Sequence, residues 1–350
     1  MVRFERTGIV LKGYFMVSAR RVFNSLDRNA QVEPTHILPV DCSAKPETPN
    51  FQRDAHIITG IQEFGTPFFI VDFTWKNWQN TQDHHPHSRR GVNHDMANKL
   101  KQILQKGKPA IGTWLGCSDP YFVEMMADLG FDWLLIDMEH IPISQEGLRT
   151  MLMACKGSES TVLVRVSLNS RNHIQAALDL GAQGVMVPMV NSRADAERAV
   201  EFTRYPPRGR RGLGPIRAGR YGKNDAGYRK TANEENLLFV QIETPEAVQN
   251  VEEILSVKGI DGLYIGNGDL ANFMNDGKVG SAKVQKVVDD LIELATRRSL
   301  PVGLPTWSPA EYHRYAQRGA QLLTIGSDMR FAANGGTAEL LGTRELLKNG

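Results

Sequence analysis

Short apolar runs in this sequence end in acidic, basic or imidazole side chains. The segment FDWLLIDMEH, residues 131–140, finishes with Asp137, Glu139 and His140 in quick succession. Imidazole is the side chain best suited to accept a proton near neutral pH, and neighbouring carboxylates can orient it. The run therefore predicts a buried strand whose end delivers acid–base chemistry.

Three further runs end in the same manner. LVRVS carries Arg165, and VQIET carries Gln241 and Glu243, which project to the same side of a strand because they are two residues apart. IGNGDLA places Asp269 just after a flexible turn at 266–268. The carboxylates of Glu243 and Asp269 are hard oxygen ligands that suit Mg2+ or Mn2+, with Co2+ as a further candidate.

Eight repeats of one pattern would position these residues. From Met96 onward, runs that are nearly continuous in apolar residues alternate with segments of helical period, as in parallel sheets buried on both faces. The candidate strands begin at Ala110, Trp133, Thr161, Gly184, Leu237, Gly262, Pro301 and Leu322. This pattern predicts a (β/α)8 TIM barrel, with a doubly wound open sheet as the alternative.

A barrel would gather the chemical residues, because its active site lies where the strands end. Each residue also has a structural interpretation: Arg165 as an ion-pair partner, His140 as a structural histidine, and Glu139 as a loop residue. The stretch GNGDLA, 266–271, matches a dinucleotide-binding pattern but lacks the surrounding βαβ context. Convergence of acid, base, cation and metal ligands at the strand ends favours catalysis.

Composition excludes several classes of protein. The 350 residues are 41% hydrophobic and 23% charged with a net charge of +2, so neither nucleic acid nor a membrane surface is an expected partner. No apolar run reaches the length of a membrane span. Three cysteines without metal-ligand spacing predict a reduced, cytoplasmic protein rather than a disulfide scaffold.

The chain changes character near residue 95. Residues 1–95 show no sustained period, whereas 96–350 carry the barrel pattern. The amino-terminal part is therefore expected to be an extension or linker. It could represent an over-extended reading frame whose natural start is Met96, a targeting segment, or a small additional domain.

Residues 96–350 resemble the metal-dependent 2-oxo-acid aldolases of the HpcH/HpaI family, which includes 4-hydroxy-2-oxo-heptanedioate and 2-dehydro-3-deoxyglucarate aldolases. The resemblance implies a phosphoenolpyruvate/pyruvate-type barrel. It rests on stretches that occur in the family's order: FDWLLIDMEH, VRVSLN, LDLGAQGVMVPMV, RYPPRGRRGLG, VQIETPEAVQNVEEIL, GIDGLYIGNGDLA and TIGSD. The turn GNGDLA departs from the family by lacking a proline, which is expected to loosen the presentation of Asp269.

The resemblance implies a role for each matching residue. His140 corresponds to the general base, and Arg165 to the cation that holds the pyruvyl group. Glu243 and Asp269 correspond to the metal ligands. Gln241 and the backbone of Gly268 correspond to substrate contacts.

Two acids and the assembly are also implied. Asp179 corresponds to a carboxylate that raises the basicity of the histidine, although it falls near a helix end that should point away from the mouth. Asp137 is expected to contact the hydroxyl end of the substrate. Either acid could act within its own subunit or in a neighbouring one, because the family implies a homo-oligomer, a hexamer, with the C-terminal helix at the interface.

Cleaving a carbon–carbon bond beside a carbonyl needs an electron sink, either a lysine Schiff base or a Lewis-acid metal. No lysine falls at a predicted strand end, so a metal is favoured. The predicted reaction converts 4-hydroxy-2-oxo acids to pyruvate and an aldehyde. The alternatives are a malyl-CoA or citramalyl-CoA type thioester lyase, an oxaloacetate decarboxylase, and a non-catalytic protein that binds 2-oxo acids.

Overall fold

The chain divides into two units, Met1–Val92 and Asn93–Gly350. The computed structural model describes residues 2–6, 9–13, 51–61, 67–77 and 97–349. The first unit contains two antiparallel pairs, β1 (Val2–Arg6) with β2 (Ile9–Gly13) and β3 (Phe51–Ile61) with β4 (Pro67–Asn77). The predicted boundary at residue 95 lies outside the described residues, so the extent of the extension stays a prediction.

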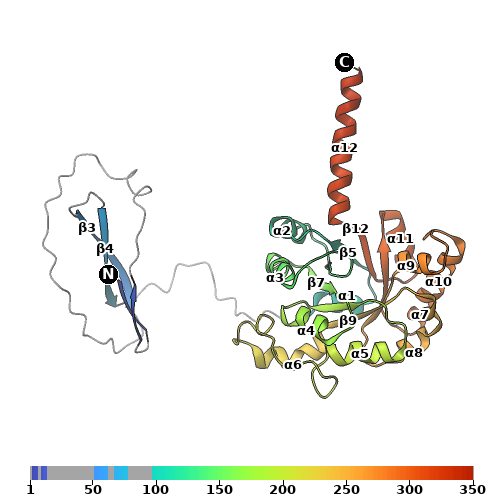
Figure 1. Ribbon diagram of the computed structural model, residues 1–350, viewed down its shortest axis with the longest axis horizontal. Helices are drawn as coiled ribbons and strands as arrows, with labels where there is room; N and C mark the ends of the chain where they lie inside the picture. The colour runs from blue at the N-terminus through green and yellow to red at the C-terminus, as the bar shows by residue number, and fades with distance from the viewer. Residues whose placement is uncertain (1, 7–8, 14–50, 62–66, 78–96, 350) are drawn as a thin grey trace. The chain divides into compact units, whose positions relative to one another are not determined.

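A closed barrel of parallel strands forms the second unit (Figure 1). Each strand pairs with the next along the chain, and β12 closes the ring against β5. The strands are β5 (Ala110–Leu115), β6 (Trp133–Asp137), β7 (Thr161–Arg165), β8 (Gly184–Val187), β9 (Leu237–Ile242), β10 (Gly262–Ile265), β11 (Val302–Thr306) and β12 (Leu322–Ser327). Every predicted strand is present, which confirms the (β/α)8 barrel and excludes the open sheet.

Helices surround this ring as predicted, with additions. They are α1 (Lys99–Gln105), α2 (Pro120–Asp128), α3 (Gln145–Ala154), α4 (Arg171–Asp179), α5 (Arg193–Thr203), α6 (Asp225–Glu235), α7 (Pro245–Gln249), α8 (Val251–Leu255), α9 (Asn267–Phe273), α10 (Ala282–Arg297), α11 (Pro309–Gln317) and α12 (Asp328–Asn349). The sequence did not predict α1, α6 or α9. The helix expected after β9 is divided at Asn250.

One local prediction was wrong. The stretch 266–268 was expected to be a flexible turn, but Gly266 is the N-cap of α9, and Asn267 is buried as its first residue. The Cβ of any other residue at 266 would lie 2.6 Å from the Cβ of Glu243. Glycine is therefore required here by the close approach of β9 to the start of α9, and Asp269 is carried on a helix rather than on a loose loop.

The barrel interior forms its own apolar cluster. Its members include Trp133, Phe239 and Tyr264, together with Leu100 and Leu104 from α1. The backbone N–H of Leu100 donates to Thr161 Oγ1 at 3.1 Å, which ties α1 to the first residue of β7. Helix α1 therefore closes the end of the barrel at which the strands begin and leaves the opposite end for the site.

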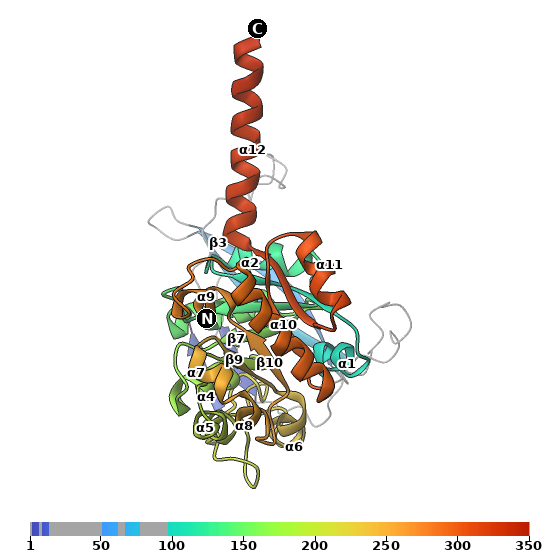
Figure 2. The ribbon, with the colours of Figure 1, turned by 90° about the vertical axis from the view of Figure 1, so that its right-hand side faces the viewer.

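Helix α12 differs from the other helices because it stands away from the barrel in both views (Figures 1 and 2). Its residues from Met329 to Lys348 are exposed. Among the residues that the structure describes, none of the helices combines the length and hydropathy of a membrane span.

Gly112 gives a test of packing inside the barrel. A Cβ at this position would overlap the indole of Trp133, whose side chain is fully buried. Gly112→Ala should therefore lower the free energy of unfolding by about 1–3 kcal/mol, because a packed interior cannot accept the added atom. Gly336→Ala, in open space within α12, should raise it by about 0.5–1 kcal/mol. Denaturant titration of both variants compares the two; an unchanged midpoint for Gly112→Ala would contradict the packing.

Candidate active site

The end of β6 and the end of β7 meet in a buried ion pair. Arg165 is 6% exposed, and its Nε and Nη2 donate to Asp137 Oδ1 at 3.0 Å and Oδ2 at 2.8 Å. Its Nη1 lies 3.0 Å from Glu139 Oε2. The two parallel hydrogen bonds to Asp137 fix the direction of that edge of the guanidinium. The structure thus brings Arg165, Asp137 and Glu139 together, as the strand-end argument predicted.

Asp137 is committed to contacts within its own chain. Besides holding Arg165, its Oδ1 accepts the backbone N–H groups of Glu139 at 3.0 Å and His140 at 3.3 Å. These hydrogen bonds turn the chain as it leaves β6 and fix the backbone positions of Glu139 and His140. The expected contact of Asp137 with the substrate stays a prediction, while its structural role in orienting Arg165 is visible.

Glu243 follows β9 and is held by one residue of that strand and by one residue that follows β8. The Met189 N–H donates to its Oε1 at 2.7 Å, and Gln241 Nε2 donates to its Oε2. Met189 has a φ of 54°, a left-handed conformation that is rare for such a side chain. That conformation directs its N–H at the carboxylate. Gln241 Oε1 is buried without a hydrogen-bond partner, so it is available to a ligand.

Negative charge accumulates around these residues. Burial raises the pKa of Glu139 to about 7, against the lowering effect of Arg165, and the charges of Glu243, Asp137 and Asp269 raise it further. Burial also raises the pKa of Glu243, to which the charge of Asp269 contributes. Neighbouring negative charge thus adds to burial in making Glu139 and Glu243 harder to ionise.

A divalent cation would relieve this repulsion, and the donor set fits one. Glu243 and Asp269 offer carboxylate oxygens, the donors that Mg2+ and Mn2+ prefer. In the described part of the chain, no three His, Cys, Asp or Glu side chains are grouped so as to hold a metal by themselves. A site with two carboxylates leaves the remaining positions to water and substrate oxygens, as Mg2+ sites commonly do.

His140 lies at the solvent side of this cluster. Its side chain is 57% exposed, and its Nε2 lies 3.9 Å from Glu139 Oε2, too far for a hydrogen bond but close enough for attraction when the ring is protonated. Gly268 is also exposed, and no atom lies within 4 Å of a Cβ built on it, which leaves space beside its backbone. Both positions can be reached by a ligand.

Asp179 is not brought to this cluster within the chain. It ends α4, and its Oδ1 accepts a hydrogen bond from Arg211 Nη2 at 2.6 Å. Arg211 is buried and stacks on Tyr205, with 4.6 Å between Cζ and the ring centre. No contact between Asp179 and His140 is present among the described residues. A catalytic role for Asp179 stays a prediction that would need a neighbouring subunit.

Sequence reasoning missed two residues of the site. It did not assign Met189 because backbone conformation leaves no clear mark in the sequence. It did not single out Trp114, which falls in the candidate strand that begins at Ala110, yet its ring centre lies 4.3 Å from Arg165 Cζ. An indole near the end of a barrel strand, with a buried arginine expected nearby, was the signal available for Trp114.

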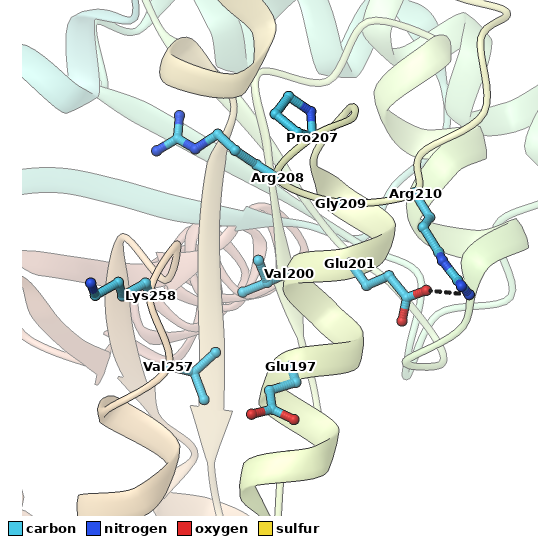
Figure 3. A pocket seen from close by; sticks show the side chains of 9 residues that line it. All are labelled: Glu197, Val200, Glu201, Pro207, Arg208, Gly209, Arg210, Val257 and Lys258. Atoms are coloured by element: carbon cyan, nitrogen blue, oxygen red, sulfur yellow. Dashed lines mark ion pairs between the residues drawn. The ribbon is translucent and has the colours of Figure 1, made fainter.

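A separate cavity of about 310 Å3 lies elsewhere (Figure 3). It is lined by α5, by the segment 207–210 that follows this helix, and by Val257–Lys258, which precede β10. Arg210 on its wall is paired with Glu201. This cavity therefore does not contribute to the cluster around Arg165.

The pKa of Glu139 predicts a dependence of stability on pH. Because its folded-state pKa, about 7, exceeds its ordinary value of about 4.5, its contribution is fully present at low pH and is lost as the pH rises through 7. In EDTA, the melting temperature of the wild type should fall between pH 5 and 8 more steeply than that of Glu139→Gln. Mg2+ should reduce the difference at pH 8. Parallel melting curves for the two proteins would contradict the predicted ionisation.

Similarity to known proteins shows the family of this chain. Residues 110–335 match the family model for HpcH/HpaI aldolase/citrate lyase. A 4-hydroxy-2-oxo-heptane-1,7-dioate aldolase of Klebsiella pneumoniae is 39% identical over 71% of this chain and 94% of its own length. An HpcH/HpaI family structure from Burkholderia cenocepacia superposes with a TM-score of 0.68 at 30% identity, covering 71% of this chain and all of that one. The citrate synthase SbnG superposes with a TM-score of 0.65 at 26% identity, covering 71% and 98%. The chain therefore belongs to the HpcH/HpaI aldolase/citrate lyase family.

Proposed function

We propose that this carbon–carbon lyase is a divalent-metal-dependent aldolase that converts 4-hydroxy-2-oxo acids to pyruvate and an aldehyde. The observation that carries the proposal is the buried Arg165 paired with Asp137 and Glu139, with the charges of Glu243 and Asp269 acting on the same Glu139 carboxyl. Arg165 supplies one fixed positive charge, and a bound divalent cation would supply the further positive charge that these carboxyl groups need. The name of the Klebsiella relative makes 4-hydroxy-2-oxo-heptane-1,7-dioate the first substrate to test.

The side chains can divide the reaction between them. His140 accepts the proton of the C4 hydroxyl, the C3–C4 bond breaks, and the aldehyde leaves while the bonding electrons pass into the enolate of pyruvate. Arg165 holds the carboxylate and the developing oxygen charge of that enolate. Return of a proton to C3 completes pyruvate. Gln241 Oε1 and the open backbone at Gly268 are placed to contact the substrate.

Glu243 and Asp269 would hold the metal. When bound, it supplies Lewis-acid stabilisation of the charge that develops on the keto oxygen, an effect often worth several kcal/mol of barrier. The positive charge of the metal would also offset the cost of ionising Glu139 and Glu243, whose pKa values burial raises.

Two catalytic alternatives use the same arrangement. An oxaloacetate decarboxylase needs the cations but no base for a C4 hydroxyl, so it would not require His140. A thioester lyase needs room for a CoA group at the mouth. The SbnG likeness favours neither alternative, since that protein is named a citrate synthase.

We also propose that the chain forms a homo-oligomer through α12. Isolated helices are marginal in water, and this one contains Gly335 and Gly336 near its middle. Leu340, Leu341 and Leu347 are each more than half exposed on it. Apolar side chains on an unsupported helix are stabilised when a second subunit covers them. A hexamer, implied by the resemblance, is the expected assembly.

A reducing compartment, such as the cytoplasm, suits the cysteines. Cys117 and Cys155 are free thiols, and Cys155 is buried. Burial raises its pKa to about 11, so it is a poor nucleophile and behaves as an apolar core residue.

The proposed reaction is tested with purified protein, Mg2+ or EDTA, and a panel of 4-hydroxy-2-oxo acids and CoA thioesters assayed for pyruvate. We expect release that needs Mg2+ and falls at least a hundredfold in Glu243→Gln and His140→Ala. His140→Ala should still decarboxylate oxaloacetate. Release from thioesters alone, or none from any compound with metal bound, would overturn the aldolase proposal.

Assembly is tested by charge on one face of α12. Leu340→Glu combined with Leu347→Glu places two carboxylates on the same side of the helix, one heptad apart. We expect the molar mass by light scattering to drop to a smaller species. Ala338→Glu lies on the opposite side and should leave the mass unchanged. An unaltered mass in the double variant would show that α12 is not the interface.

A further inference from the structure

One face of Arg165 is covered by an aromatic ring. Asp137 holds one edge of the guanidinium with two hydrogen bonds and Glu139 Oε2 lies 3.0 Å from Nη1, while the Trp114 ring centre lies 4.3 Å from Cζ. In-plane hydrogen bonds fix direction but leave the group free to tilt about that edge. A ring against one face restrains the tilt and attracts the cation.

Trp114 is itself held by a buried chain of hydrogen bonds. Its Nε1 donates to Thr324 Oγ1 at 2.9 Å, and the hydroxyl of Tyr264 lies 3.2 Å from the same oxygen. The Tyr264 ring meets the indole edge-on, with 6.0 Å between centres. Thr324 and Tyr264 are fully buried. The chain therefore runs from Arg165 on β7 through β5 and β12 to β10.

The position of Thr324 is fixed by an irregularity in the barrel. The pairing of β12 with β5 shifts between Thr324 and Ser327. At this irregularity two backbone carbonyls accept hydrogen bonds from side chains: Thr324 O from Thr306 Oγ1 at 2.6 Å, and Ile325 O from Thr113 Oγ1 at 3.0 Å. With its backbone pinned on both sides, Thr324 presents a stationary acceptor to the indole.

From this geometry we infer that Trp114, anchored by Thr324 and Tyr264, is a positioning residue that sets the tilt of Arg165 toward the carboxylate of a bound 2-oxo acid. The inference rests on the proposed function for the identity of the ligand. A guanidinium has five N–H groups, and the two bonded to Asp137 leave two on Nη1 and one on Nη2 for a ligand. The direction of these N–H groups depends on the plane of the guanidinium, and contact with the Trp114 ring sets that plane.

Trp133 provides a matched control. It is a second indole inside the same barrel, fully buried and edge-on to the same Tyr264 ring, with 6.5 Å between centres. Its Nε1 donates to Ala110 O at 3.3 Å, at the end where the strands begin. Replacing Trp133 disturbs the interior without touching Arg165, and so separates general packing from positioning.

The test measures oxalate affinity by calorimetry in Mg2+ buffer, because oxalate is planar like an enolate and needs no turnover. Trp114→Leu should weaken oxalate binding about tenfold through loss of the ring face. Trp114→Phe should recover part of that loss, and Thr324→Val should weaken binding a few fold through loss of the acceptor. Trp133→Phe should bind like the wild type, and melting curves establish that each variant is folded.

Wild-type affinity in Trp114→Leu, or an equal loss in Trp133→Phe, overturns the inference, as does a wild type that does not bind oxalate. Pyruvate release is scored separately on the wild type. Loss of oxalate affinity in the Trp114 variants, with no pyruvate released by the wild type, would leave the positioning inference standing and remove the aldolase reaction. Pyruvate release by the wild type, with unchanged oxalate affinity in the Trp114 variants, would support the aldolase reaction and remove the positioning inference.

Discussion

The buried guanidinium of Arg165 determines the arrangement of the site around it. A charge this far from water is stable only with partners, and Asp137 and Glu139 supply them from the end of the neighbouring strand. Burial makes Glu139 and Glu243 costly to ionise, which is why the pKa values of both are raised. The site therefore gathers more carboxyl groups than its arginine can pair, which supports the proposed divalent cation.

The barrel makes this concentration of charge possible. Its interior is filled by Trp133, Phe239 and Tyr264. Helix α1 closes the end at which the strands begin, so the polar residues of the site lie where the strands end. Pairing of adjacent strands brings Asp137 directly beside Arg165. Where the register of β12 shifts, the hydroxyls of Thr113 and Thr306 donate to backbone carbonyls of β12. The hydroxyl of Thr324 accepts the hydrogen bond of the Trp114 indole. Irregular backbone and buried polar groups thus occur where the ligand is expected.

Two features extend beyond the single chain. Asp179 is bound to Arg211 on the outer side of α4, so any action on His140 would come from another subunit. Helix α12 carries exposed leucines that nothing within the described chain covers. An assembly would give both features a physical reason, because it covers apolar surface and brings outer faces close to neighbouring mouths.

Most of the architecture could be predicted from the sequence. Continuous apolar runs such as TVLVR and LLFVQI are required by strands buried on both faces, and their polar ends identified Asp137, Arg165 and Glu243 without coordinates. Tertiary structure alone decided what those side chains contact. Asp137 binds Arg165 rather than remaining free, Gly266 begins a helix rather than a flexible turn, and Trp114 lies against a cation rather than in an apolar core. The physical reason is that apolar runs and periodicity depend on residues that are close together in the sequence. A charge partner, a close backbone approach or an aromatic contact joins residues that only the closed barrel brings together.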